Sequence, residues 1–321
     1  MRVRLAVAAL LVIVPALVAT PAAAQSCNFT LSALDFGTIN LSANTTFTTT
    51  ATFSASCTGT ANTTVRTCPN IDAGSGGSSN GNPRLLLNGA SQLNFNLYQD
   101  GAYTSVWGSN LWAYAGSYPS PTLDVALNNS GSGSGSLTLY GQIWAGQPTL
   151  PAGSYSSSFT GTQSSVAYAY STVGSCATIG NSHATTAAFT VSATNATICA
   201  VSAAPLNFGS TGVLRSAIDG TGTVTVTCTN AAPYTLSLDG GLSGASDPTQ
   251  RKMTQGGRSV TYGLYQDSAR GVPWGSSAGV NTAAATGTGL AQSFTVYGRV
   301  PAQNTPAPGT YSDTVVATIT Y

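Results

Sequence analysis

The sequence contains few residues whose types and spacing could support catalysis. Its nine acidic residues are all aspartates, and His183 is its single histidine. Asp100 and Asp267 occur in matching QDG and QDS segments, where aspartate is favoured because its side chain bonds the backbone of a turn. A Ser-His-Asp triad would have to use His183, and no GxSxG segment lies near it. We therefore predict no catalytic residues and no enzymatic activity.

Metal, cofactor and nucleic-acid sites have no better support in the sequence. The cysteine spacings lack the CxxC pairs of zinc sites, and no phosphate-binding GxxxxGK[ST] segment occurs. Charged residues make up 6% of the chain, against about 25% in an average globular protein. With a net charge of +1 and a single lysine, Lys252, the chain offers no basic surface for nucleic acid. We predict no metal, no cofactor and no nucleic-acid partner.

One long segment of the chain occurs twice. LYQDGAYTSVWG at 97–108 corresponds to LYQDSARGVPWG at 264–275, and LDFG at 34–37 corresponds to LNFG at 206–209. Such self-similarity, with copies about 170 residues apart, fixes the architecture before any strand is assigned. We predict a signal peptide at 1–24, followed by domain one at 25–195 and domain two at 196–321.

Domain one carries large apolar side chains that domain two lacks. Its VWG segment is followed by SNLWAYAGSYPSP where domain two has SSAGVNTAAATG, and its QIWAGQP segment has a tryptophan where the second copy has Pro301. Large aromatic residues among Gly, Ser and Pro suggest an exposed binding surface, although Tyr and Trp also fill cores. Both interpretations stay open for Leu111, Trp112, Tyr114, Tyr118 and Trp144.

The cysteines belong to an exported chain. Residues 1–24 combine arginines at 2 and 4, an apolar run at 5–18 and three alanines before Gln25, which is the pattern of a secretory signal. Cysteines behind such a signal form disulfides. Those near the start of each copy have nearly the same spacing, and the remaining two belong to segments found only in domain one. We predict three disulfide bonds: Cys27–Cys57, Cys199–Cys228 and Cys68–Cys176.

Both copies show the period-two alternation of β-strands. From Phe47 to Cys57 mostly apolar residues occupy every second position, and threonine-rich segments alternate with Gly, Asn and Ser clusters. This pattern predicts an all-β sandwich for each domain. Domain one continues to AAFTVSATN at 187–195, a strand without a counterpart in domain two. We expect domain two to expose a groove lined by Val224, Val226, Val315 and Ile319.

The order of these motifs resembles the spore coat protein U domain. Each copy places a cysteine, LxFG, LYQD with WG, and YG in that order, and domain two ends in PGTYSDTVVATITY. The match is close over 199–321 and covers 27–57, 84–108 and 137–156 of domain one. The resemblance implies immunoglobulin-like pilin domains, the second lacking its final strand. The implied partners are a periplasmic pilus chaperone, an outer-membrane usher and the next pilin subunit, which supplies the missing strand.

Two-domain members of this family look like tip adhesins of archaic chaperone-usher pili. Only Gln25 and Ser26 lie between the signal and Cys27, whereas a donated strand needs about five residues. We therefore expect an extracellular pilus-tip adhesin, secreted through the periplasm, that binds an abiotic surface or host ligand through domain one and supports biofilm formation. One alternative is a spore-coat or matrix protein, in which both domains pack symmetrically and 111–118 is buried. Another is a secreted carbohydrate-active enzyme, which the absent glutamate disfavours.

Overall fold

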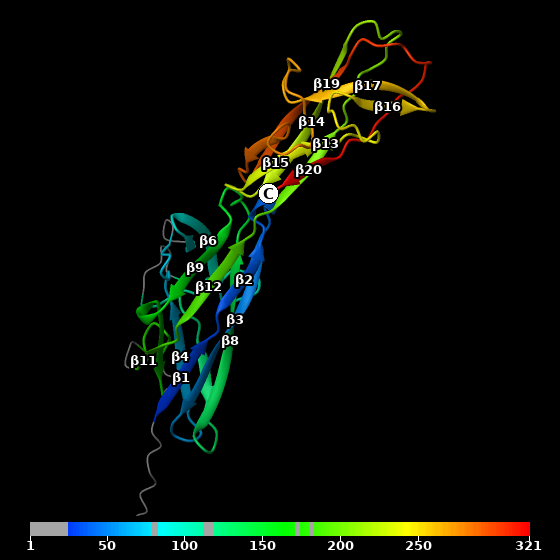
Figure 1. The fold of residues 1–321 in the computed structure, drawn as a ribbon. Helices are drawn as coiled ribbons and strands as arrows, with labels where there is room; N and C mark the ends of the chain where they lie inside the picture. The colour runs from blue at the N-terminus through cyan, green and yellow to red at the C-terminus, as the bar shows by residue number, and fades with distance from the viewer. Residues whose placement is uncertain (1–24, 79–82, 112–117, 171–173, 180–182) are drawn as a thin grey trace, which may run out of the picture.

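Two elongated β domains stand end to end, and the C terminus lies beside the junction between them (Figure 1). Apart from strands, the regular structure of the described residues consists of two short 3₁₀ helices, η1 (Leu41–Ala43) and η2 (Gly161–Gln163). The predicted fold class, two tandem β-sandwiches, is confirmed; the predicted signal peptide lies outside the described residues. The computed structural model describes residues 25–78, 83–111, 118–170, 174–179 and 183–321.

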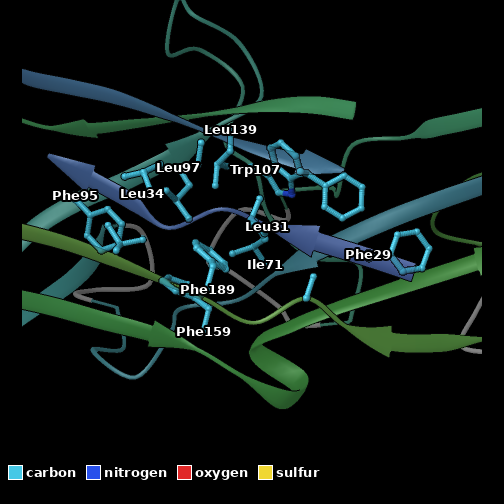
Figure 2. Packing of buried hydrophobic residues seen from close by; sticks show 14 of the residues in the cluster. Phe29, Leu31, Leu34, Ile71, Phe95, Leu97, Trp107, Leu139, Phe159 and Phe189 are labelled. Carbon is cyan, nitrogen blue, oxygen red and sulfur yellow. The ribbon is translucent and has the colours of Figure 1, made fainter. Parts of the chain in front are cut away.

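Domain one is a sandwich of two sheets around one core. Trp107, Phe95 and Leu139 lie in this core, and each is at most 1% exposed (Figure 2). The larger sheet contains, in spatial order, β1 (Ser26–Leu31), β3 (Phe47–Thr58), β8 (Ser132–Ile143), β6 (Ser91–Tyr98), β5 (Arg84–Asn88), β9 (Gly153–Phe159), β12 (Phe189–Asn195) and β2 (Leu34–Ile39). The smaller sheet contains β11 (Ala184–Thr186), β10 (Ser164–Ala169), β4 (Thr64–Ile71) and β7 (Leu123–Ala126).

Domain two repeats this sandwich with fewer strands. Its own core is built on Val226, Leu236 and Trp274, and none of these three side chains is more than 1% exposed. The larger sheet contains, in spatial order, β13 (Cys199–Ala204), β14 (Ile218–Cys228), β19 (Ala291–Val300), β17 (Arg258–Tyr265) and β16 (Arg251–Gln255). The smaller sheet contains β18 (Ala283–Thr286), β15 (Pro233–Leu238) and β20 (Ala317–Thr320).

The alternation in the sequence explains which side chains face the core. Along β3, Phe53, Ala55 and Cys57 are buried, whereas Thr52, Ser56 and Thr58 are exposed. Successive side chains of a strand point to opposite faces, so a period-two pattern buries one row and leaves the other in solvent. The row in solvent is rich in Ser and Thr, which accounts for the low charge of the surface.

All three predicted disulfides are present. In each domain the first bridge joins directly opposite residues of neighbouring strands, with 4.1 Å between Cα atoms. The third bridge links β4 to the segment 174–179 of domain one. The bonds are Cys27–Cys57, Cys199–Cys228 and Cys68–Cys176, and no free cysteine occurs among the described residues.

In each domain a buried arginine bonds the backbone of the WG motif. Arg84 and Arg251 are 0% exposed, and each donates hydrogen bonds to backbone carbonyls of its domain. The acceptors are Ile71, Asp72 and Trp107 for Arg84, and Leu238, Asp239, Pro248 and Trp274 for Arg251. One of these carbonyls belongs to Trp107 in domain one and to Trp274 in domain two, at 2.7 and 2.8 Å. Because a buried guanidinium needs partners for its donors, this arrangement explains why the motif recurs in both copies.

The domains meet through a short hydrogen-bonded junction. Residues 196–198 are all that separates β12 from β13. On one side, the buried Asn195 side chain donates to the Leu150 carbonyl at 3.2 Å. On the other side, the buried Thr229 hydroxyl donates to the Ala196 carbonyl at 2.9 Å and accepts the Ile198 N–H at 3.0 Å. Both ends of the connection are therefore fixed by side chains of the domains that it joins.

Candidate strand-acceptor groove

Strand β12 completes the core of domain one. It pairs antiparallel with β9 along its length and parallel with β2 on its other side. Phe189, Val191 and Ala193 point inward and are 6%, 0% and 1% exposed. The ring of Phe189 stacks on that of Phe159 with 4.4 Å between centroids (Figure 2). Full burial of a Phe or Val side chain stabilises a domain by about 1.5–3 kcal/mol, so β12 is a large part of this core.

Residues 309–316 of domain two occupy the place that β9 has in domain one. Tyr311 corresponds to Tyr155, because each tyrosine hydroxyl donates to the carbonyl four residues before it, at 2.8 Å in both domains. Within the described ranges, the only β-bridge of 309–316 joins Ser312 to Thr254. No described strand runs along its other side, where domain one has β12. The segment is therefore left with an open edge.

An open groove of about 410 Å³ lies beside this edge. One wall is the segment 203–208, which contains the counterpart of β2, and the other wall is 311–317. Buried side chains of Val224, Leu264 and Val296 form its apolar floor. An extended peptide here could form backbone hydrogen bonds to the open edge and place alternate apolar side chains on the floor, which is how proteins accept an added strand.

The groove residues expected from the sequence occupy three different places. Val224 and Val315 line the groove. Val226 is 0% exposed and lies on the same strand as Val224, in the core. Ile319 lies on β20, where it pairs with Leu236 of the smaller sheet. Their contact with a donated strand stays a prediction.

The final segment of domain two therefore serves both sheets. Residues 309–316 form the groove wall, whereas β20 pairs with β15 in the way that β10 pairs with β4. In domain one, β11 pairs with the outer edge of β10. The corresponding edge of β20 is also open within the described chain. An incoming strand could thus contact the groove wall and continue along β20.

One polar pair interrupts the apolar lining of the groove. The Tyr262 hydroxyl donates to Asp313 Oδ2 at 2.7 Å, and the Leu242 N–H donates to Asp313 Oδ1 at 2.8 Å. Burial raises the pKa of Tyr262, and the hydrogen bond to Asp313 raises it further. The phenol therefore stays protonated and keeps its role as donor. Neither residue is among those expected from the sequence to line the groove.

The five residues considered for surface binding are distributed over two segments. Leu111 is 44% exposed and Tyr118 is half-buried, while Trp112 and Tyr114 lie outside the described residues. Trp144 is half-buried in the loop after β8, and the carbonyl of Thr149 in the same loop accepts a hydrogen bond from the Asn230 side chain of domain two. Burial raises the pKa of the Tyr98 hydroxyl, and Trp144 offsets part of that rise. Binding by these five residues stays a prediction.

Two features of the described residues bear on other functions. They contain no group of three or more His, Cys, Asp or Glu side chains that could hold a metal ion. Among the same residues, no helix is long and apolar enough to cross a membrane. The aspartates of the repeated motif act in turns: Asp100 accepts the Ser105 N–H at 2.7 Å, and Asp267 accepts the Val272 N–H at 2.7 Å.

Sequence comparisons place both copies in one family. The model of the Spore Coat Protein U domain family matches residues 13–162 and 185–318. A relative, Protein U of Myxococcus xanthus, is 39% identical over an alignment of 129 residues that covers 36% of this chain and 71% of that protein.

Solved structures give a corresponding result for the fold. The chain is similar to a chain of the CsuC-CsuE chaperone-tip adhesion subunit pre-assembly complex from archaic chaperone-usher Csu pili of Acinetobacter baumannii. The TM-score is 0.51 at 15% identity, and the match covers 92% of this chain and 100% of the other. For the CupB6 tip adhesin from Pseudomonas aeruginosa the TM-score is 0.38 at 13% identity, covering 92% of this chain and 94% of that one. The fold is thus similar to that of the matched chain of the Csu complex.

Proposed function

This chain belongs to the Spore Coat Protein U domain family, and from that membership and its open groove we propose that it is the tip adhesin of a chaperone-usher pilus. Domain two accepts a strand in trans, first from a periplasmic chaperone and then from the next pilin subunit. Domain one attaches the pilus to an abiotic surface or a host ligand and so promotes biofilm formation. The groove beside residues 309–316 is the observation that carries the proposal.

The groove supports strand acceptance because domain one supplies the filled version of the same site. An uncovered edge beside an exposed core promotes aggregation, so domain two needs a partner during export and afterwards. Strand β12 indicates what that partner presents: an extended segment antiparallel to 309–316, with a large apolar residue and smaller ones at alternate positions. Backbone hydrogen bonds give such a complex its affinity, and the alternate side chains set its register.

The other partners and the location follow from this assembly. Three disulfides suit a chain that passes through an oxidising compartment. An outer-membrane usher would then exchange the chaperone strand for that of the next subunit and export the chain to the cell surface. Domain one already contains its own closing strand, which leaves it free for attachment. The exposed Leu111 marks the first surface to test.

The test compares residues 199–321 alone with the same fragment plus a peptide of the β12 sequence, FTVSATN. We expect the fragment alone to aggregate or unfold, and we expect the peptide to recover it as a 1:1 complex in size-exclusion chromatography with mass detection. A stable monomer that unfolds cooperatively and ignores the peptide would show that domain two is complete. The pilus proposal would then be withdrawn.

A structural coat or matrix protein is the second candidate, and the description of the matching family, Spore Coat Protein U domain, favours it. Such a protein would pack both domains symmetrically, whereas here one domain is closed and the other open. Genes for an usher and a periplasmic chaperone beside that for this chain would decide for the pilus. Assembly of the purified chain alone into sheets would decide for the coat.

A further inference from the structure

The groove wall of domain two carries a polar residue at its centre. Its inward-facing residues are Tyr311, Asp313 and Val315, where domain one has Tyr155, Ser157 and Phe159. The residue that bonds Asp313 differs as well, because Tyr262 on β17 pairs with Arg251 in the register in which Phe95 pairs with Arg84. Two linked differences between the copies thus create one hydrogen-bonded pair that domain one lacks.

The Asp313 carboxylate joins the wall to two other elements. Tyr262, on β17, donates to one oxygen at 2.7 Å, and Leu242, in the loop after β15, donates its N–H to the other at 2.8 Å. Gly241, with φ of +67°, allows this approach: a Cβ atom at that position would lie 2.1 Å from Asp313 Oδ2. The carboxylate is therefore fitted closely against the loop and the strand.

The hydrogen bonds of Asp313 hold the wall in place of the backbone ladder that a neighbouring strand would form. In domain one, β9 is held by the continuous ladder to β12. In domain two the wall keeps an extended course with one bridge, from Ser312 to Thr254, among the described residues. Hydrogen bonds to a charged acceptor are about twice as strong as neutral ones. A wall held by such bonds is organised before a strand arrives, which lowers the ordering cost of binding.

We propose that Asp313, held by Tyr262 and the Leu242 N–H, is a positioning residue that keeps the wall 309–316 in the course needed to receive a strand. The inference rests on the proposed function, since it concerns the same groove. It adds that acceptance of a strand depends on a polar pair in an otherwise apolar groove. Domain one already contains its closing strand, β12, and has Ser157 and Phe95 at these positions.

The experiment uses the whole chain without its signal segment and a fluorescent peptide of sequence AFTVSATNA, residues 188–196. Variants are Asp313→Ala, Asp313→Asn and Tyr262→Phe, with Ser157→Ala as the matched control in domain one. Peptide association rates are normalised to the folded fraction of domain two. Hydrogen exchange of the 309–316 amides is measured in parallel. Exchange reports the order of the wall, whereas loss of overall stability alone would not change the normalised rate.

We expect Asp313→Ala to slow association about tenfold or more, the scale of one charge-assisted hydrogen bond, and to speed exchange across 309–316. Asp313→Asn should recover most of the rate because its amide oxygen can still accept the Leu242 N–H, and Tyr262→Phe should have a smaller effect than Asp313→Ala. Ser157→Ala should behave like the unaltered chain. Equal rates in Asp313→Ala and the unaltered chain would overturn this inference while leaving the proposed function intact.

Two other outcomes also decide. If the unaltered chain takes up no peptide, the proposed function fails and this inference fails with it. If Asp313→Ala does not fold, Tyr262→Phe carries the decision: slower uptake with faster exchange supports the inference, and an unchanged rate overturns it.

Discussion

Domains one and two build the same sandwich and differ in how its last edge is treated. In domain one the chain returns as β11 and β12, which pair with β10 and β9. In domain two the chain reaches Tyr321 just after β20, and the groove next to 309–316 stays open. Both domains retain the buried arginine and the paired disulfide. The framework is therefore independent of the closing strand, whereas completion of the core depends on it.

The largest expected effect comes from removing this difference. Appending residues 184–195 after Tyr321, through a Gly/Ser loop of about six residues, should fill the groove from within. Burial of one Phe and one Val predicts a gain of about 5 kcal/mol in the unfolding free energy of domain two. Urea unfolding of the extended chain measures it. The same extension carrying the change Val191→Asp serves as control and should give little of the gain; an equal gain would mean that the groove is not the binding place.

The second prediction concerns the disulfide bond that only domain one has. Replacing Cys68 and Cys176 with Ala opens a loop with a sequence separation of 108 residues. Loss of such a bond should lower the unfolding free energy of domain one by about 2–5 kcal/mol. Domain two should be unaffected. Separate unfolding transitions, followed by hydrogen exchange, check both statements, and an equal loss in both domains would contradict the division of the chain.

The third prediction concerns adhesion by domain one. Replacing Leu111, Trp112 and Tyr114 with Ser should reduce attachment to polystyrene at least tenfold, because apolar contact contributes about 25 cal/mol per Å² buried. The control replaces Val272 and Val280, which are 48% and 82% exposed in domain two, with Ser. Attachment of piliated cells is measured with secretion as reference. Failure of the triple variant to fold would assign these residues to the core.

The smallest expected effect is a pH dependence shared by both domains. Backbone hydrogen bonds lower the pKa values of Asp100 and Asp267. The largest contribution comes from the Thr104 N–H for Asp100 and from the Val272 N–H for Asp267. Because the folded pKa lies below the ordinary value of about 3.9, the stabilisation is present above that value and is lost as pH falls through the folded pKa. Asp100→Asn should flatten this dependence in domain one only. Thermal unfolding between about pH 5 and pH 2 tests it.

Much of this architecture could be predicted because the repeat supplies an internal alignment. The matching spacings of Cys27 to Cys57 and of Cys199 to Cys228 reduce the number of possible disulfide pairings. The strand at 187–195 has no counterpart in domain two, which predicts an open core there. The position of Ile319 could not be predicted in the same way. The alternation of apolar residues continues unbroken through Val315, Ala317 and Ile319, so the pattern does not reveal that the segment passes from one sheet to the other.

The polar pair in the groove shows a second limit. Asp313 and Tyr262 are far apart in the sequence, and a single aspartate in an alternating strand usually points to solvent. The signal that could have found them is the paired difference between copies, Ser157 against Asp313 and Phe95 against Tyr262. Trp144 illustrates a third limit, since only the fold shows that its loop bonds the other domain, through the Thr149 carbonyl and the Asn230 side chain.

The junction between the domains has a consequence for orientational freedom. A flexible linker would let domain one sample a wide range of directions about domain two, with a reach that grows with linker length. Here only residues 196–198 intervene, and side chains of Asn195 and Thr229 bond the backbone on either side. The short, hydrogen-bonded connection leaves domain one little room to turn about domain two, so the direction in which its surface points is tied to the axis of domain two.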